Sequence, residues 1–368
     1  MRATDTSTSR RTLLRRTAAV LVGGAIGSRL PMPALAALRP VKFTLAWLAQ
    51  GSSLYVYIAR AKGMTKARGI DLEISRGFGS MASAQTIAGG QFEFGIIAAP
   101  PLALSVAKGL PLIALATCDY NSTMGVGVLA DSPIRKPQDL AGKKMGAVPT
   151  SGEYPFFPAY AKKIGLDMAS VELVHVDNKV LELILIEKQV DAIMGFGGSS
   201  LPVILSKGVP ARWMLYSGAG IHTYGQTIST QPKILEGEAG LCEAITGALL
   251  EAEAFTLTNP QESLEIFLKE VPEMALSGSS KEFARIGMGM WHHAIDQPEP
   301  REHGIGWSDP TIYSEMADLV MQYLASPGMT RPGPDALVTN RFIGKVKLTA
   351  PQWEQMHERS AEFAKLMS

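Results

Sequence analysis

The sequence predicts an α/β protein of two lobes, each with a mostly parallel sheet and flanking helices, together with a helical C-terminal part. Three observations predict this fold class. From Val41 short apolar, strand-like runs alternate with amphipathic helical stretches, which is the pattern of βαβ units around a parallel sheet. The alternation starts again near Gly125, and after Thr230 helical spacing continues almost throughout.

The first lobe takes its strands from apolar runs rich in β-branched and aromatic residues. These runs are Val41–Ala49, Ile70–Ser75, Phe94–Ala98 and Leu112–Thr117. Helical spacing lies between them at Leu54–Lys66, Met81–Ala88 and Pro101–Ala107. Gly, Ser or Pro introduces each of these helices, as expected of a helix start.

The second lobe repeats the alternation without repeating the residues. Its expected strands are Gly125–Ala130, Lys144–Val148, Val171–His175, Asp191–Met194 and Arg212–Leu215, and its expected helices are Tyr154–Ile164, Val180–Lys188 and Ser200–Ser206. One further strand, Tyr224–Thr230, precedes helices at Leu241–Thr258, Pro260–Glu270, Lys281–Ala294, Pro310–Leu324 and Pro351–Lys365. We expect these last helices to return and pack on the first lobe.

Such a return divides the chain into residues 1–36, a first lobe of residues 37–120 plus 222–368, and a second lobe of residues 121–221. The chain then crosses between the lobes near residues 119–124 and 218–224. Ser217-Gly218-Ala219-Gly220 lies at the second crossing, and glycine gives the backbone the freedom that a hinge needs. We therefore expect two lobes that can move about these crossings.

The first 36 residues have the three-part pattern of an export signal. A basic segment, Ser9–Arg16, is followed by an apolar run, Thr17–Gly27, and by the small-residue motif Ala34-Leu35-Ala36. The paired arginines favour the twin-arginine pathway. The apolar run is shorter than the roughly 17 to 25 residues of a permanent membrane helix. The pattern predicts cleavage near Ala36 and a periplasmic protein without stable membrane insertion, with a disordered basic tail as the alternative.

Charge and cysteine content exclude several classes of protein. Beyond residue 36 the chain has 29 Lys and Arg against 33 Asp and Glu, a net charge of −4, which argues against a nucleic-acid partner because that partner needs a basic face. Cys118 and Cys242 are the only cysteines, so a multi-disulfide scaffold and a cysteine metal cluster are excluded. We expect two buried thiols, with one disulfide between them as the alternative.

Seven patches along the chain resemble a known family in their order and spacing. They are Phe43–Trp47, Leu54–Gly63, Arg68–Glu73, Gly89–Gly95, Asp139–Lys144, Val190–Ile193 and Thr339–Ile343. Together they resemble the periplasmic substrate-binding proteins of ABC transporters, of the thiamine-pyrimidine-precursor, taurine and alkanesulfonate (NMT1/THI5-like, SsuA-like) type. The resemblance covers nearly the whole chain beyond the export signal.

This resemblance implies a type II periplasmic-binding-protein fold whose two lobes close on a small-molecule ligand. It implies an ABC transporter permease and ATPase as partners, and binding without chemistry, so no catalytic residue and no cofactor are expected. We expect the protein to be a monomer. The same superfamily contains pyrimidine synthases that use pyridoxal phosphate, but the cysteine-rich motif of those enzymes is missing from this chain.

The ligand site is predicted from the rule that ligands of open α/β sheets lie beyond the carboxyl ends of the strands. In the first lobe this rule selects Trp47, Gln50, Ser52, Ser53, Tyr55, Phe78, Gly79, Ser80 and Ala99. In the second lobe it selects Thr150, Ser151, Gly152, Glu153, Tyr154, Asn178, Phe196 and Gly197. The aromatic members of this set favour a ring-bearing ligand over a bare inorganic oxyanion.

Several of these residues have a purely structural alternative. The small residues at Ser52-Ser53, Gly79-Ser80 and Thr150-Ser151-Gly152 could hold an acidic ligand group at helix N-termini, or only cap the helices. Trp47 could stack on a planar ligand or fill the core. Glu153 could receive an amino group of the ligand or only stabilise a helix N-terminus.

The run Met288–His293 contains adjacent histidines and suggests a metal site. Adjacent residues of a helix point about 100° apart and cannot both face one ion without other ligands, which the neighbouring sequence does not offer. We therefore expect packing there and no metal. The sequence has no Gly-x-Ser-x-Gly elbow, no P-loop and no His-Glu-x-x-His, which are the common motifs of hydrolases, NTPases and zinc proteases.

These observations predict a transport receptor, with two alternatives of other classes. One is an enzyme on the same fold related to the pyrimidine synthases, and the other is a periplasmic ligand sensor. The export signal favours the receptor, because the cofactor of the enzymes stays in the cytoplasm. The sequence leaves a heteroaromatic compound, a sulfonate and an aromatic carboxylate open as ligands.

Overall fold

The computed structural model describes residues 37–276 and 278–366. The predicted twin-arginine signal therefore lies outside the described residues. Within them the strands form two five-stranded sheets. We call the first sheet and the helices packed on it lobe I, and the second sheet with its helices lobe II. The exact residue limits of the lobes given above stay a prediction.

The sheet of lobe I has the strand order β2-β1-β3-β10-β4. Its strands are β1 (Arg39–Thr44), β2 (Ile70–Ser75), β3 (Phe94–Ala98), β4 (Ile113–Thr117) and β10 (Gln226–Thr230). Four strands run in one direction, and β10 runs antiparallel between β3 and β4. The chain therefore returns to the middle of its first sheet after it has built the second.

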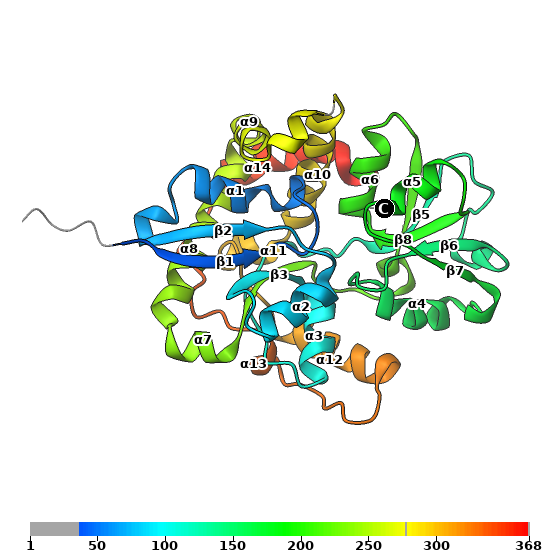
Figure 1. Ribbon diagram of the computed structural model, residues 1–368, viewed down its shortest axis with the longest axis horizontal. Coiled ribbons are helices and arrows are strands. Elements are labelled where there is room, and N and C mark those ends of the chain that lie inside the picture. The colour runs from blue at the N-terminus through cyan, green and yellow to red at the C-terminus, as the bar shows by residue number, and fades with distance from the viewer. Residues whose placement is uncertain (1–36, 277, 367–368) are drawn as a thin grey trace, which may run out of the picture. The chain divides into compact units, whose positions relative to one another are not determined.

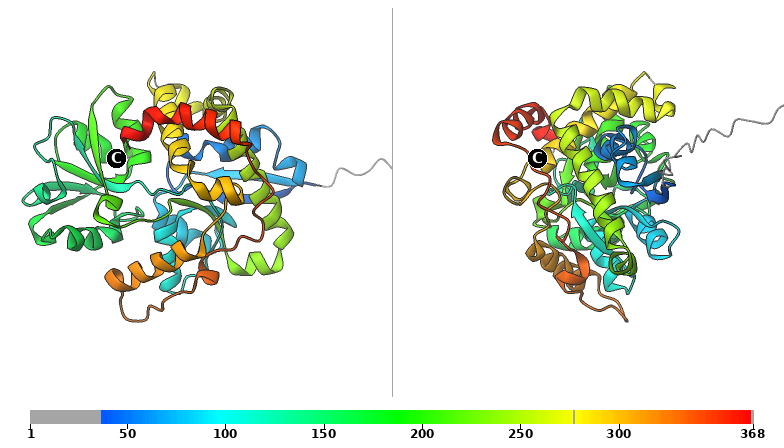
Figure 2. Two further views of the ribbon diagram at one scale, coloured as in Figure 1. Left: turned by 180° about the vertical axis from the view of Figure 1, so that it is seen from behind. Right: turned by 90° about the vertical axis from the view of Figure 1, so that its left-hand side faces the viewer.

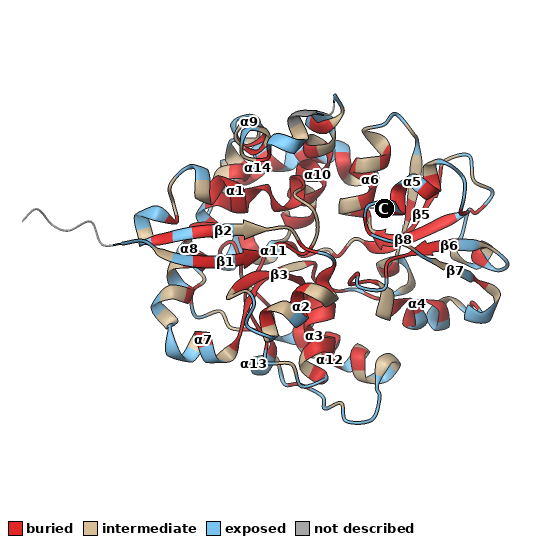
Figure 3. Ribbon diagram, in the orientation of Figure 1, coloured by how far each residue is buried: buried red, intermediate tan, exposed pale blue. Residues whose placement is uncertain are grey.

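Helices cover both sides of this sheet. On one side α1 (Leu54–Ala61) packs against α8 (Ala239–Thr258) and α9 (Pro260–Glu270); on the other, α3 (Ala99–Ala107) packs against α2 (Ser80–Ala88) and α12 (Pro310–Leu324). In Figure 1, α1 and α9 lie above β1 and β3, and α2, α3 and α12 lie below them. Because α3 lies between the sheet and α12, it is buried along most of its length (Figure 3).

The sheet of lobe II has the order β7-β6-β8-β5-β9. Its strands are β5 (Met124–Leu129), β6 (Lys144–Ala147), β7 (Glu172–His175), β8 (Ala192–Phe196) and β9 (Ala211–Leu215), and its helices are α4 (Phe157–Ile164), α5 (Leu181–Ile186) and α6 (Gly197–Leu205). Here β5 is the antiparallel strand, between β8 and β9. Each sheet is thus mostly parallel, as predicted, with one reversed strand.

Trp213 on β9 lies against glycines of the neighbouring strand. A Cβ added at Gly127 would lie 2.2 Å from Cζ3 of the Trp213 indole, and one at Gly125 would lie 2.6 Å from its Nε1. The indole nitrogen donates a hydrogen bond to the carbonyl of Thr123 at 3.0 Å. The ring therefore occupies a slot in which any side chain on β5 at these positions would clash.

The C-terminal part adds α7 (Pro232–Gly237), α10 (Ser280–Ile295), α11 (Pro298–His303), α13 (Pro334–Leu337) and α14 (Ala350–Ser360) to the helices already described. Helix α10 packs on the 3₁₀ turn Gly51–Ser53 of lobe I and also on α6 of lobe II. The last described turn, Ala361–Leu366, follows α14 to lobe II, where Phe363 joins the apolar cluster that contains Trp213. Figure 2 shows this end of the chain beside lobe II in the view from behind.

Element ends differ from the prediction where the backbone turns before the apolar pattern stops. Strand β1 ends at Thr44 instead of Ala49, because the following segment bends and the carbonyl of Trp47 accepts from the amide of Gly77. Helix α1 ends at Ala61 instead of Lys66, and Gly63 follows with a φ of +71°. Helix α4 begins at Phe157, because Tyr154–Phe156 forms a 3₁₀ turn. The short helices α7, α11 and α13 were not predicted.

Both cysteines are buried free thiols, as predicted. Cys118 lies in lobe I, where its sulfur accepts from the hydroxyl of Tyr55 at 3.3 Å, and Cys242 lies on α8. Among the described residues we find no helix with the length and apolarity required to span a bilayer.

Candidate ligand cleft

Two small adjoining cavities lie where the carboxyl ends of the two sheets meet. We call them the cleft cavities. Each has a volume of about 30 Å³, and Phe196, Ser199 and Gln226 line both. The first is completed by Ala46, Trp47, Gly79, Ser80, Ala98, Ser151, Leu181, Gly195 and Ser200. The second is completed by Ser52, Asp119, Asn121, Thr123, Gly198, Gly225, Met290, Trp291 and Ala294.

Lobe I contributes one aromatic ring and one buried hydroxyl to the first cleft cavity. Trp47 follows β1, at the carboxyl end of the strand. Ser80 begins α2, and its Oγ accepts a hydrogen bond from the amide of Ala98 at 3.1 Å. Because Ser80 uses a lone pair there, its own proton remains free to be donated.

Lobe II contributes two hydroxyls that are each held by a buried carboxyl group. Ser151 donates to Oε2 of Glu153, and Ser200 donates to Oε1 of Glu182 at 2.7 Å. Both serines line the first cleft cavity, whereas the two glutamates lie directly behind them and are buried. Each of these two hydroxyls in the cavity wall therefore has a buried carboxyl group behind it.

Burial governs the electrostatics of this wall. It raises the pKa of Glu153 to about 7, against the smaller opposing effect of the hydrogen bond from Ser151. Burial likewise raises the pKa of Glu182, and the charge of Glu182 adds to the rise at Glu153. The Oε1 of Glu153 is buried and has no hydrogen-bond partner among the described residues. Neither cleft cavity has Lys, Arg or His among its lining residues.

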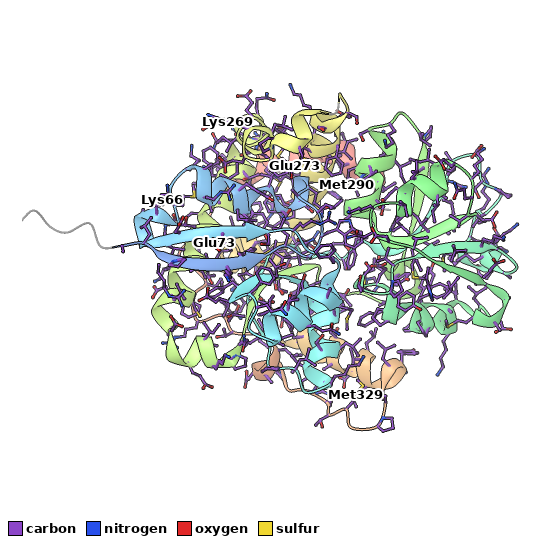
Figure 4. All side chains as sticks on the ribbon, viewed as in Figure 1. Lys66, Glu73, Lys269, Glu273, Met290 and Met329 are labelled. Carbon is purple, nitrogen blue, oxygen red and sulfur yellow. The ribbon has the colours of Figure 1, made fainter. Side chains whose placement is uncertain are left out.

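The second cleft cavity reaches into lobe I. Asp119 follows β4, and its Oδ2 accepts from the amide of Gln226 at 3.1 Å. Burial raises the pKa of Asp119 to about 7. Met290 and Trp291 come from α10 (Met290 is labelled in Figure 4), and the Trp291 indole donates to the carbonyl of Cys118 at 2.8 Å. A third buried acid, after Glu153 and Glu182, thus lies at the lobe I side of the cleft.

Among the residues that the structure describes, three side-chain hydrogen bonds join the lobes around the cleft cavities. Nε2 of Gln50 lies 3.1 Å from Oγ of Ser199, and it also donates to Ser52 at 2.9 Å. Oγ1 of Thr150 donates to the carbonyl of Phe78 at 2.6 Å. Nη2 of Arg76 lies 3.4 Å from Oδ1 of Asn178. With these bonds formed and cavities of this size, the lobes stand in a closed arrangement.

The structure brings part of the predicted site together. Trp47, Ser52, Gly79, Ser80, Ser151 and Phe196 line the cleft cavities. Gln50, Thr150 and Asn178 form the hydrogen bonds between the lobes. Gly152 lies between Ser80, Pro101 and Phe196, so that a Cβ there would meet all three. Glu153 does not line either cavity, but its carboxyl group accepts the hydrogen bond of the Ser151 hydroxyl.

The remaining predicted residues lie elsewhere. Tyr55 is fully buried in lobe I, where it stacks on Trp291 with ring centroids 5.4 Å apart. Phe78 is 53% exposed beneath the guanidinium of Arg76. The hydroxyl of Tyr154 pairs with Nε2 of His175 at 3.0 Å. Three more have backbone or packing roles: Ser53 donates to the carbonyl of Gln50, Ala99 donates to the carbonyl of Gly225, and Gly197 packs on Trp213.

Sequence reasoning missed Asp119, Glu182, Ser200, Gln226 and Trp291. The predicted site stops at Gly197, the first residue of α6, and Ser200 lies three residues later on the same helix. Extending the predicted site by one helical turn would have included it. Gln226 opens the reversed strand β10, whose place between β3 and β4 the pattern does not reveal. Glu182 and Asp119 are acids next to apolar runs, and an unpaired acid in such a run is a signal of functional interest.

The described residues hold no group of three or more His, Cys, Asp or Glu that could hold a metal ion. His292 is buried on α10, where burial lowers its pKa to about 3, and its Nε2 has no partner among the described residues. The cleft instead offers hydroxyl, amide and carboxyl groups around an apolar space. Such a set is suited to binding a small polar molecule that has a flat apolar face, and the two cavities of about 30 Å³ each must widen to admit one.

The chain is similar in sequence to known proteins from several organisms. The chain is 26% identical over 67% of its length to a Haemophilus influenzae protein named for thiamine biosynthesis, of which the match covers 78%. It is 23% identical over 64% of its length to a formylaminopyrimidine-binding protein of Halalkalibacterium halodurans, covering 72% of that protein. A riboflavin-binding protein, RibY, of Chloroflexus aurantiacus is 21% identical over 78% of this chain and is covered to 81%.

Solved structures show the same fold. The alkanesulfonate-binding protein SsuA of Xanthomonas axonopodis pv. citri, bound to MOPS, superposes with a TM-score of 0.63 at 14% identity, covering 83% of this chain and 100% of that one. The periplasmic nitrate-binding protein NrtA of Synechocystis PCC 6803 gives 0.59 at 12% identity, with coverages of 90% and 91%. The fold is therefore that of the solute-binding components of ABC import systems. The family model described as NMT1/THI5 like matches residues 50–263, more than half of the chain, and the protein belongs to this family.

Proposed function

We propose that this protein is an extracytoplasmic receptor of an ABC importer that binds an amino-bearing heteroaromatic compound between lobes that close on it. The observation that carries the proposal is the pair of hydroxyl–carboxyl contacts in the wall of lobe II, Ser151 with Glu153 and Ser200 with Glu182. They decide which hydrogen-bonding groups a ligand must bring.

A serine hydroxyl that gives its proton to a carboxylate has only its lone pairs left for a ligand. Ser151 and Ser200 therefore present acceptors to the cleft, and the ligand should bring N–H or O–H donors. Ser80 on the opposite wall has its own proton free, because its oxygen already accepts from Ala98, so it can donate to a ring nitrogen. An aminopyrimidine has both kinds of group on adjacent atoms.

The charges around the cleft point the same way. A sulfonate or a carboxylate would bring a negative charge to a wall backed by two buried acids, with no Lys, Arg or His among the lining residues. In a buried site an anion without a cationic partner is costly, and more so where it meets an ionised carboxylate. Trp47 and Phe196 provide the apolar surface for a flat ring. Relatives named for binding formylaminopyrimidine and riboflavin support a ring ligand with N–H donors.

The transport role rests on the fold and on the family. Import receptors of this fold release their ligand to a membrane permease that an ATPase drives, and these are the partners we propose here. Lobe closure on the ligand would supply the signal that the permease recognises. As part of the same proposal, the predicted export signal would carry this receptor to the periplasm.

A thermal-shift panel with the purified chain tests the ligand class. Formylaminopyrimidine, riboflavin and simple 4-aminopyrimidines form one arm, and ethanesulfonate, benzoate and nitrate form the other. A ligand at 100 times its Kd adds about 2.7 kcal/mol to the free energy of unfolding, so binding is readily seen. Shifts confined to the aminopyrimidine arm are expected, together with recovery of the unchanged compound after denaturation. Shifts confined to the anions would refute the proposed ligand class, and turnover of a bound compound would refute the receptor role.

A further inference from the structure

A cavity of about 840 Å³ lies on lobe II away from the cleft, and it shares no lining residue with the cleft cavities. It borders β9, α4, the crossing segment at Tyr216–Ala219 and the C-terminal turn that ends at Leu366. Its volume falls in the range of about 300 to 1,000 Å³ that is typical of small-molecule sites. The proposed transport function gives this cavity no role.

Most of the cavity surface is apolar. Ile134, Ile164, Leu215 and Leu366 contribute aliphatic side chains, and Trp213 contributes an aromatic ring. The Trp213 ring is held in place by the glycine slot on β5 and by its hydrogen bond to Thr123. A rigid aromatic wall of this kind favours a flat or extended apolar group in a ligand.

The polar part of the cavity is cationic. Arg135, Arg212 and Lys365 line it, and no Asp or Glu is among its lining residues. The guanidinium of Arg212 donates from Nη2 to the carbonyls of Ser132 and Ile134 at 3.1 and 2.9 Å, while its Nε is buried and finds no partner within the described part of the chain. Among the described residues, neither Arg135 nor Arg212 forms an ion pair with a carboxylate. An apolar cavity with uncompensated guanidinium groups selects an anion.

Tyr160 supplies a second, independent sign of a ligand. Its side chain is fully buried and lines the cavity, and its hydroxyl has no hydrogen-bond partner among the described residues. The ring is fixed by stacking on Tyr216, with centroids 4.3 Å apart. A buried hydroxyl left without a partner costs about 1 to 3 kcal/mol, and an acceptor atom of a ligand would remove this cost once the side chains that cover the hydroxyl move aside.

We propose that this cavity is a second binding site, separate from the cleft, for a small amphipathic carboxylate such as an aromatic or acyl acid. The carboxylate lies toward Arg135 and Arg212, and the hydrocarbon part lies along Trp213 and the aliphatic wall. The site accepts one negative charge with a flat or extended apolar body. This is the opposite of the donor-rich, uncharged ligand proposed for the cleft.

The test uses 2-naphthoate as the probe and 2-naphthamide as its neutral counterpart, in calorimetric titrations of the full chain. We expect naphthoate to bind and naphthamide to bind at least tenfold more weakly, because a charge-assisted hydrogen bond contributes about this factor. Arg135→Gln should weaken naphthoate binding about tenfold. Lys136→Gln, which removes the same charge from the next residue outside the cavity lining, should leave the affinity within about twofold.

Two further variants show whether naphthoate occupies this cavity or the cleft. Tyr160→Phe should weaken naphthoate binding while the fold is kept. Arg212 is left unchanged in this test, because its two hydrogen bonds to backbone carbonyls support the fold. Trp47→Ala, in the cleft, should leave naphthoate binding unchanged. Equal affinity for naphthoate and naphthamide, equal effects of Arg135→Gln and Lys136→Gln, or a loss of binding in Trp47→Ala alone would each overturn the proposal.

Discussion

Nε2 of Gln50 in lobe I lies 3.1 Å from Oγ of Ser199 in lobe II, and this hydrogen bond spans the cleft beside both cavities. It exists only while the lobes are together. Ser199→Ala removes it without touching the core, so we expect a smaller closed population and ligand affinity lowered about fivefold, as the loss of one net hydrogen bond gives.

Small-angle scattering of the ligand-free and ligand-bound variant would report the closed population directly. The matched control is Ser206→Ala, which makes the same change at the other end of the same helix, where the hydroxyl donates to Val203 within lobe II. If both variants bind ligand like the unchanged protein, the contact does not contribute to closure.

Glu153 should make stability depend on pH in a direction unusual for a carboxyl group. Its pKa is raised from 4.5 to about 7 in the folded protein. Between these pH values the folded protein keeps a proton that the unfolded chain loses, so the free energy of unfolding falls as pH rises from about 4.5 to about 7. The full effect is at most about 3 kcal/mol. Glu153→Gln should therefore match the unchanged protein near pH 5 and exceed its stability at pH 8.

Urea unfolding at the two pH values measures this difference. Glu187→Gln, at an exposed glutamate of the same lobe, serves as the control and should show no such divergence. A Glu153→Gln variant that is less stable at pH 8 than the unchanged protein would mean that the carboxylate is stabilised by a partner instead of being strained by burial. In ligand titrations at pH 8, where Glu153 is ionised, the same variant should bind an aminopyrimidine more weakly, because a neutral amide holds the Ser151 proton less firmly.

Gly127→Ala should destabilise lobe II. The added methyl group would lie 2.2 Å from the Trp213 ring, and either the ring or the strand must shift, at a cost of about 1 to 3 kcal/mol. Gly240→Ala, on α8 with no atom within 4 Å of the new methyl group, should be neutral or slightly stabilising, since alanine favours a helix. Thermal unfolding compares the two, and equal melting temperatures would show that Trp213 relaxes freely.

Trp47→Ala should lower affinity for a flat ring ligand about tenfold, through the loss of stacking and apolar surface. Trp307→Ala, at a tryptophan that packs on His303 away from the cleft, controls for general loss of aromatic area. Calorimetric titration with the best aminopyrimidine measures both. Unchanged affinity in Trp47→Ala would contradict a role for stacking.

The sequence allowed the fold to be predicted because its signals are local. The strand runs Ile70–Ser75 and Phe94–Ala98 stand at their predicted limits, since alternation and turn residues mark both ends of each. The places of β5 and β10 were not predictable in this way. Each runs antiparallel between two strands that are far from it in sequence. Only tertiary packing determines which strands it pairs with.

The site was partly predictable for the same reason. Ser80 and Ser151 follow β2 and β6 by a few residues and Phe196 ends β8, so the carboxyl-end rule finds them. Tyr55 lies in an equally favourable position along the chain, yet one turn of helix directs its ring into the core against Trp291. Glu182 reaches the wall only through Ser200, eighteen residues away in sequence, and no local pattern indicates that pairing.

Helix α10 contacts both lobes, so that separation of the lobes must break one of the two contacts. Its neighbours in lobe I include the Gly51–Ser53 turn, α9 and α14, whereas in lobe II it meets α6, where Ile286 and Met290 join Leu201 and Ile204 in one apolar cluster. Opening would therefore expose hydrocarbon to water. Because such exposure becomes more unfavourable on warming across the physiological range, the ligand-free receptor should rest closed more often in warm surroundings than in cold ones, and temperature would tune how readily it admits its cargo.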